Sequence, residues 1–138
     1  GSLMRVLPLA FVRDVTDEQI AAVSSLTHAH EMSIDYCIRY VRLAEALIRG
    51  EVVTFPYEEP VRASGFVRDT FNAVMYSLAT TASYRECVLK AVNLGDDTDT
   101  VAAIAGGLAG IKYGFEAIPE DWLDALRGKE IIEACLFK

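Results

Sequence analysis

An uncharged apolar run from Val101 to Ile111 limits the fold of this 138-residue chain more than any other feature. The run is about 11 residues long, whereas a helix needs roughly 20 apolar residues to cross a bilayer. Its three glycines each cost about 1 kcal/mol relative to alanine inside a helix. Tight helix–helix contact explains them best, with close approach of a ligand to the backbone as the alternative. The run therefore predicts a buried central helix over residues 99–113.

The rest of the chain carries helix start and stop signals, and strand signals are nearly absent. Thr16 to Gln19 has the T-x-x-Q form of a capping box, and Ser83 with Glu86 repeats this pattern. Gly50 ends a long amphipathic segment, and two prolines mark one loop over residues 51–64. We expect an all-α fold, one domain over 1–138, with helices at mixed angles. The predicted helices cover residues 17–24, 30–50, 65–80, 84–93, 99–113, a short segment after Pro119, and 130–137.

Charge and cysteine usage exclude several classes of protein. A formal net charge of -7 argues against binding to nucleic acid or to an anionic membrane, because phosphate attraction needs a basic patch. Cys37, Cys87 and Cys135 are far apart in sequence, so neither a disulfide framework nor a zinc site is expected. Residues 3–12 contain Arg5 and lack the features of a signal peptide. These observations predict a cytoplasmic protein.

The densest block of carboxylates directly precedes the apolar run. Asp96, Asp97 and Asp99 alternate with Thr98 and Thr100. One such aspartate or threonine is most often a helix cap. Three carboxylates are more than a cap requires, and their mutual repulsion is relieved by a cation. Carboxylate and hydroxyl oxygens suit hard cations, so the block predicts a metal site for a ligand that carries phosphates or hydroxyls.

A second polar motif is the H-x-H pair of His28 and His30. Histidine can bind a metal or a phosphate, but in this place before a helix a capping or surface role is the stronger interpretation. No serine or cysteine lies beside a convincing base in the sequence, so covalent catalysis has no specific support.

These motifs together resemble a known family. The segment that carries most of the resemblance is "NLGDDTDTVAAIAGGLAGIKYGFEAIPEDWLDAL", which is similar to the C-terminal signature of the ADP-ribosylglycohydrolases. Further similarity lies in "GSLMRVLPLAF", "LTHAHEMSID" and "SGFVRDTFNAVMYSLATTASYRECVLKAVNLG". Tyr76 stands where the family usually has tryptophan, and Ile34 and Asp35 interrupt its small residues after the histidines.

The resemblance implies an all-α fold around two Mg²⁺ or Mn²⁺ ions, and hydrolysis of the glycosidic bond between ADP-ribose and a protein side chain. The residues it implies as metal ligands are Asp97, Asp99 and Thr100, with Asp96 and Thr98 behind them as supports. The residues it implies along the ADP-ribose are Gly1, Ser2, Met4 and His28. A metal pair would lower the pKa of a bound water and hold ribose hydroxyls.

Two family motifs have no counterpart in this sequence. They are the T-D-D-T segment, which supplies the other metal ligands, and the G-D-A-x-G stretch near the general acid/base carboxylate. We therefore expect a C-terminal portion, equivalent to about half of the family's fold. Three hypotheses follow: a hydrolase portion that needs the N-terminal half, a binding remnant without turnover, and a structural protein of the crystallin kind. Exposed apolar faces on helices 30–50 and 99–113 would favour a homo-oligomer or a complex with the missing half.

Overall fold

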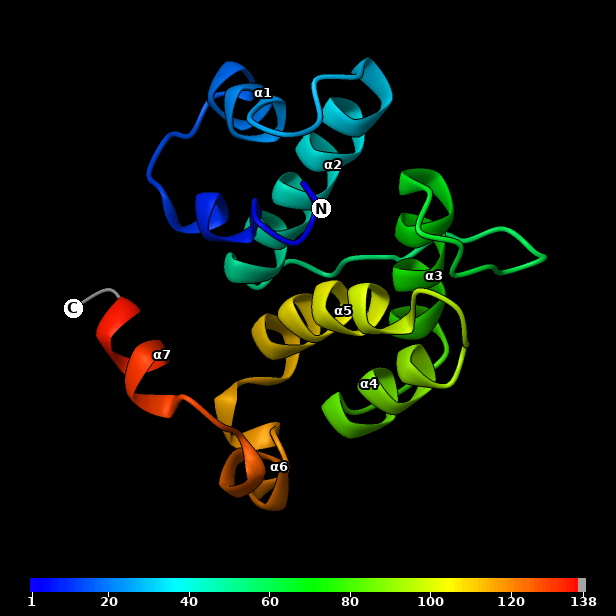
Figure 1. The fold of residues 1–138 in the computed structure, drawn as a ribbon, viewed down its shortest axis with the longest axis vertical. Helices are drawn as coiled ribbons and strands as arrows, with labels where there is room; N and C mark the ends of the chain where they lie inside the picture. The colour runs from blue at the N-terminus through cyan, green and yellow to red at the C-terminus, as the bar shows by residue number, and fades with distance from the viewer. Residues whose placement is uncertain (137–138) are drawn as a thin grey trace.

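The chain folds into helices joined by short loops (Figure 1). In the computed structural model, residues 1–136 are described, and among them no strand occurs. The all-α prediction is confirmed. The α-helices are α1 (Asp17–Ser25), α2 (Glu31–Ile48), α3 (Val67–Ala79), α4 (Tyr84–Val92), α5 (Thr98–Tyr113), α6 (Glu120–Ala125) and α7 (Lys129–Cys135), and the 3₁₀ helices are η1 (Leu7–Phe11) and η2 (Phe115–Ala117).

Helix α5 is the centre of the fold. It packs against α2, α3 and α4, and Figure 1 shows it crossing the middle of the molecule. Val101, Ile104 and Leu108 are almost fully buried. The expectation that the apolar face of residues 99–113 would be exposed is therefore wrong, because helices of this same chain cover it. The apolar face of α2 is also covered, because Cys37, Tyr40 and Val41 belong to the same core.

The glycines of α5 allow neighbouring side chains to approach its backbone. A Cβ atom on Gly107 would lie 2.6 Å from Leu7 Cδ2 and 3.2 Å from the hydroxyl of Tyr40. That hydroxyl donates a hydrogen bond to the carbonyl oxygen of Ile104 at 3.0 Å. Gly106 faces α4, where a Cβ would lie 3.5 Å from the Tyr84 hydroxyl. Close packing therefore accounts for these glycines, as the sequence predicts.

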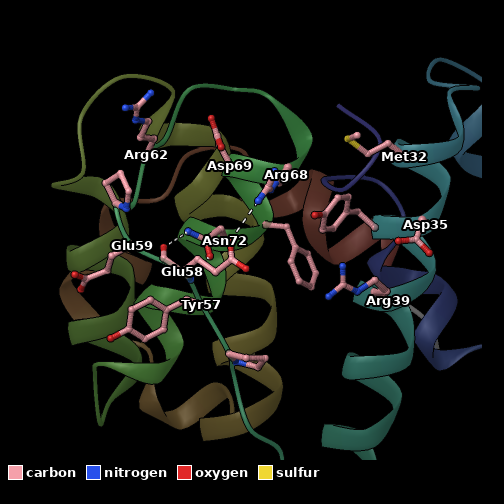
Figure 2. Close-up of a pocket in the computed structure, with 14 residues that line it drawn as sticks. Met32, Asp35, Arg39, Tyr57, Glu58, Glu59, Arg62, Arg68, Asp69 and Asn72 are labelled. Atoms are coloured by element: carbon pink, nitrogen blue, oxygen red, sulfur yellow. Dashed lines mark hydrogen bonds and ion pairs between the residues drawn. The ribbon is translucent and has the colours of Figure 1, made fainter.

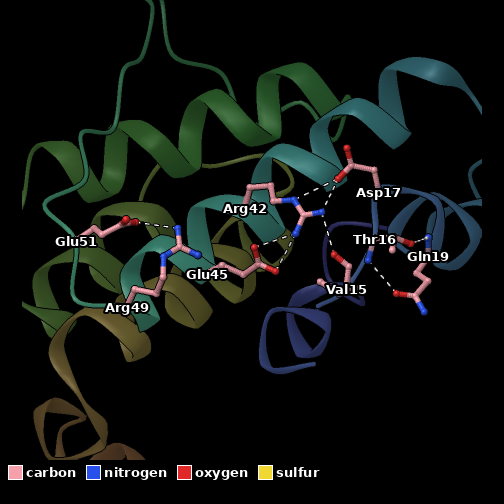
Figure 3. Close-up of polar contacts among 8 residues, drawn as sticks. All are labelled: Val15, Thr16, Asp17, Gln19, Arg42, Glu45, Arg49 and Glu51. Atoms are coloured by element: carbon pink, nitrogen blue, oxygen red, sulfur yellow. Dashed lines mark hydrogen bonds and ion pairs between the residues drawn. The ribbon is translucent and has the colours of Figure 1, made fainter. Parts of the chain in front are cut away.

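A polar network fastens α1 to α2 (Figure 3). The Arg42 guanidinium donates to Asp17 Oδ1 at 2.6 Å, to both carboxylate oxygens of Glu45 at 2.9 Å, and to the carbonyl oxygen of Val15 at 3.0 Å. Next to it, the capping box of Thr16 forms as predicted. These contacts hold the beginning of α1 against α2, and the loop with the two histidines follows the other end of α1.

The C-terminal helices α6 and α7 lie at the edge of the molecule (Figure 1). Ile131, Ile132 and Leu136 are between 46% and 66% exposed, so this end presents apolar surface. The prediction of a last helix over 130–137 holds through Cys135, and residue 137 lies outside the described residues. Every helix within residues 1–136 is too short or too polar to cross a bilayer.

Candidate functional site

Two clefts open between α2 and α3, and they share Met32. The larger one has a volume of about 790 Å³ and lies between the first halves of these helices and the loop of residues 56–62 (Figure 2). The smaller one has a volume of about 330 Å³ and lies where the first residues of the chain meet the beginnings of α2, α3 and α5. Four segments that are distant in sequence therefore form the smaller cleft.

The smaller cleft gathers most of the residues that the sequence singles out. The predicted residues that line it are Gly1, Ser2, His28, Asp97 and Thr100, and His30 of the H-x-H pair lines it as well. The predicted residues outside its lining are Met4, Asp96, Thr98 and Asp99. The Met4 residue is 51% exposed, and Asp99 is also exposed.

The aspartate turn is held in place by hydrogen bonds on both sides. The backbone N–H of Asp97 donates to the carbonyl oxygen of Ala63 at 2.9 Å, and the Thr100 hydroxyl donates to Asp97 Oδ1 at 2.9 Å. Gly65 has a φ of +81°, and a Cβ atom there would lie 3.0 Å from Asp97 Oδ2. The loop before α3 therefore fits closely around this carboxylate because residue 65 has no side chain.

The capping interpretation of the aspartate block is wrong for Asp99 and Thr100. Both residues lie inside the first turn of α5, and the N-cap is Asp97, whose side chain makes no capping hydrogen bond. The Thr98 hydroxyl instead donates to the carbonyl oxygen of Ala91 at 3.0 Å, which ties the start of α5 to the end of α4. Within residues 1–136, the Asp97 carboxylate therefore accepts a hydrogen bond from Thr100 alone.

The donors at this turn suit a hard cation but make up only part of a site. Asp97 and Thr100 present carboxylate and hydroxyl oxygens within one helical turn, and these are the ligands that Mg²⁺ and Mn²⁺ prefer. Within residues 1–136, no three side chains of His, Cys, Asp or Glu are close enough together to hold a metal ion. Further ligands would have to come from another polypeptide segment, from water or from a substrate.

His28 is positioned by a chain of hydrogen bonds from Arg5. Arg5 Nη2 donates to Thr27 Oγ1 at 2.8 Å and to the carbonyl oxygen of Val23 at 3.0 Å. Thr27 Oγ1 lies 2.7 Å from His28 Nδ1. Because the threonine oxygen accepts from arginine, its own proton is free to bond Nδ1, which favours the tautomer with the proton on Nε2. Within residues 1–136, His28 thus has a ring N–H that makes no hydrogen bond and can donate to a ligand.

His30 has a different role. Its Nδ1 accepts a hydrogen bond from the backbone N–H of Met32 at 3.2 Å, and His30 is the N-cap of α2. The capping interpretation of the histidine pair is confirmed for this residue.

Cys87 is buried, and burial raises the pKa of its thiol, which disfavours the reactive thiolate.

The cleft also contains residues that sequence reasoning did not single out. They are Leu3, Met32, Ser33, Gly65, Phe66, Val67, Thr70 and Ile104. Ile104 follows Thr100 by four positions, so helical periodicity is a signal that could have found it. Thr70 lies in a segment that resembles the family, but the sequence does not show that its hydroxyl is buried between helices.

The larger cleft contains none of the predicted site residues. Figure 2 shows Arg68 and Asn72 on α3 reaching toward Glu58. Arg68 lies 3.3 Å from a carboxylate oxygen of Glu58, and the Asn72 amide bonds both the N–H and the C=O of that residue. On the α2 side, Arg39 stacks over the rings of Tyr36 and Phe71 at 5.0 and 5.1 Å.

Comparison with known proteins finds the same family that the sequence motifs resemble. A family model described as ADP-ribosylglycohydrolase matches residues 53–137. The chain is 45% identical over 74 residues to the ADP-ribosylarginine hydrolase Tri1 of Serratia proteamaculans, and the aligned region covers 54% of the chain and 20% of that protein. It is 32% identical over 146 residues to the ADP-ribosyl-[dinitrogen reductase] glycohydrolase of Rhodospirillum rubrum, and the aligned region covers 91% of the chain and 50% of that protein.

The family match covers more than half of the chain and includes the aspartate turn and all of α3 and α5. The chain belongs to the ADP-ribosylglycohydrolase family. A third relative, the ADP-ribosylarginine hydrolase Tri1 of Pseudomonas putida, is 26% identical over 160 residues, with 96% of the chain and 43% of that protein covered. The chain thus spans half or less of the length of these three relatives.

Proposed function

We propose that this chain forms one side of the active site of a hydrolase that removes ADP-ribose from protein side chains. The observation that carries the proposal is the smaller cleft, where the aspartate turn faces residues from the start of the chain and from the loop before α2. The names of the relatives describe hydrolysis of ADP-ribosylarginine and of ADP-ribosylated dinitrogen reductase. We extend the same reaction class, cleavage of a glycosidic bond, to this protein.

Asp97 and Thr100 are the residues that would hold Mg²⁺ or Mn²⁺, with Asp99 on the same turn as a further candidate. When bound, the ion would polarise ribose oxygens and lower the pKa of a bound water. Asp96 and Thr98 would support the turn, and Thr98 does so through its bond to α4.

The other wall of the cleft would bind the ADP-ribose. Gly1 and Ser2 line this wall, and a Cβ atom on Gly1 would lie 3.0 Å from His28 Cε1, so the two segments are in close contact. The free Nε2–H of His28 would donate to a phosphate or ribose oxygen. Met4 lies outside the lining, so in our proposal it contributes no contact in the cleft. Leu3, Phe66 and Ile104 supply apolar surface that suits a base or a sugar face.

The second candidate function is binding of ADP-ribose or a metal without turnover, or a structural role of the crystallin kind. It is favoured by the partial metal site within residues 1–136.

In the hydrolase proposal, the remaining ligands and the general acid/base come from an N-terminal half with the T-D-D-T and G-D-A-x-G motifs. The exposed apolar residues of α7 suit contact with such a partner or with a second copy of the chain. The free thiols of Cys37, Cys87 and Cys135 suit a cytoplasmic location.

Titration calorimetry and a hydrolysis assay test these candidates together. We expect the chain to bind ADP-ribose in the presence of Mn²⁺, and to release ADP-ribose from a modified protein only after mixing with a polypeptide that carries T-D-D-T. Binding without release from a folded mixture would favour the non-catalytic candidate. Absence of binding, with and without the second polypeptide, would contradict both the hydrolase and the binding role.

A further inference from the structure

Thr70 is a buried residue of α3 that lines the smaller cleft. The residue is only 3% exposed, and its hydroxyl oxygen has no hydrogen-bond partner within the described part of the chain. A buried hydroxyl without a partner has lost its bonds to water and gained nothing in exchange, so it destabilises the fold. This state of Thr70 needs a physical reason.

Nearby hydroxyls show that the missing bond is a property of Thr70 itself. In helices, serine and threonine commonly donate to the carbonyl oxygen four residues earlier. Ser77 does so toward Ala73 at 2.9 Å, and Thr80 does so toward Tyr76 at 2.7 Å. The carbonyl four residues before Thr70 belongs to Phe66, and it accepts only the backbone N–H of Thr70, at 2.9 Å. The Thr70 hydroxyl therefore keeps unused hydrogen-bonding capacity in a residue that lines the cleft.

We propose that the Thr70 hydroxyl is a binding contact for an oxygen atom of a nucleoside diphosphate sugar in the smaller cleft. Valine has nearly the same shape as threonine and would occupy this buried position without an unpaired polar atom. A ligand that completes the hydrogen bond of this hydroxyl would remove the cost of burying it. The proposal rests on the function proposed above, because it takes ADP-ribose as the ligand of this cleft.

The test compares Thr70→Val with Thr70→Ser, which keeps the hydroxyl, and with Thr80→Val, which removes a hydroxyl that is already bonded within α3. Kd is measured by titration calorimetry with ADP-ribose in the presence of Mn²⁺, and thermal melting is recorded without ligand. We expect Thr70→Val to weaken binding about tenfold, a loss of about 1.4 kcal/mol. Thr70→Ser and Thr80→Val should bind as the unaltered chain does. Without ligand, Thr70→Val should melt at the same temperature as the unaltered chain or above it.

A parallel titration with ADP shows which part of the ligand the hydroxyl contacts. Weaker binding of both ADP and ADP-ribose by Thr70→Val supports a contact to the ADP part, and weaker binding of ADP-ribose alone supports a contact to the second ribose.

Three results would overturn the proposal. Unchanged affinity of Thr70→Val for ADP-ribose refutes the contact and leaves the proposed function intact. An equal loss in Thr70→Ser assigns the effect to packing of the methyl group. If the unaltered chain binds no ADP-ribose, the proposed function fails and this contact fails with it.

Discussion

The two clefts between α2 and α3 differ in the exposure of their unbonded polar groups. In the larger cleft, of about 790 Å³, Glu58 pairs with Arg68 and Asp69 accepts from Ser64 at 2.6 Å, and the other charged side chains are exposed to solvent. The smaller cleft, of about 330 Å³, contains the buried hydroxyl of Thr70, which has no partner among the described residues, and the half-buried Asp97, whose carboxylate accepts a hydrogen bond from the Thr100 hydroxyl. Our proposal therefore places the ligand by the polar groups that are buried and unbonded, and not by cleft volume.

The largest difference between the clefts should come from removing one negative charge in each. Asp97→Asn should weaken Mn²⁺-dependent binding of ADP-ribose by tenfold or more, because an amide oxygen is a poorer ligand for a hard cation than a carboxylate. The matched variant Asp69→Asn changes a carboxylate of the larger cleft that Ser64 already bonds, and it should leave Kd unchanged. Calorimetric titration measures both. Equal losses in the two variants would show that the comparison of the clefts is wrong.

A pair of glycines gives the next largest effect. Gly65 and Gly50 have φ values of +81° and +74°, so alanine at either position should cost about 1–2 kcal/mol of folding free energy. Only at Gly65 would the new Cβ also contact Asp97, 3.0 Å from Oδ2, whereas nothing lies within 4 Å at Gly50. Urea denaturation should therefore show similar losses for both alanine variants.

Ligand binding should separate the two glycine variants. We expect Gly65→Ala to weaken binding of ADP-ribose several-fold, because the carboxylate must move, and Gly50→Ala to bind as the unaltered chain does. If both variants bind ADP-ribose equally well, the close fit between the loop and Asp97 has no part in binding.

The smallest effect is expected in the larger cleft. Arg68→Gln breaks the ion pair between Arg68 and Glu58, whose side chains are 62% and 81% exposed, respectively. Ion pairs that are this exposed contribute less than about 1 kcal/mol to stability. We expect a loss of at most about 0.5 kcal/mol in urea denaturation, and no change in the Kd for ADP-ribose. A clear loss of affinity would extend the ligand site into the larger cleft.

Much of the fold could be predicted from the sequence because the signals are local. The capping residues Thr16 and Ser83 accept the backbone bonds that their motifs predict, so the helices begin where expected. The 3₁₀ helix η1 was not predicted, because its position depends on contact with α2. Exposure of the α5 face was predicted wrongly, because the sequence does not show which helices cover which.

The candidate site was predictable only where a motif coincides with helix geometry. Successive residues in a helix point about 100° apart, so Asp97 and Thr100 both reach the cleft while Asp99, two positions after Asp97, points away. Thr70 lies in a segment that resembles the family, but its unpaired hydroxyl could not have been predicted, since it arises from burial between α3 and its neighbours. Whether Asp97, Asp99 and Thr100 bind a metal stays a prediction.

The hydrogen bond from Thr98 to Ala91 has a consequence for how the two walls of the cleft assemble. It closes the short turn between α4 and α5, two helices that are adjacent in sequence and pack against each other. Contacts between residues near in sequence favour fast folding, whereas contacts across the whole chain form at a greater entropic cost. The turn that carries the aspartates is therefore closed by a local contact, whereas its bond to Ala63 and the wall formed by Gly1 join segments that are distant in sequence.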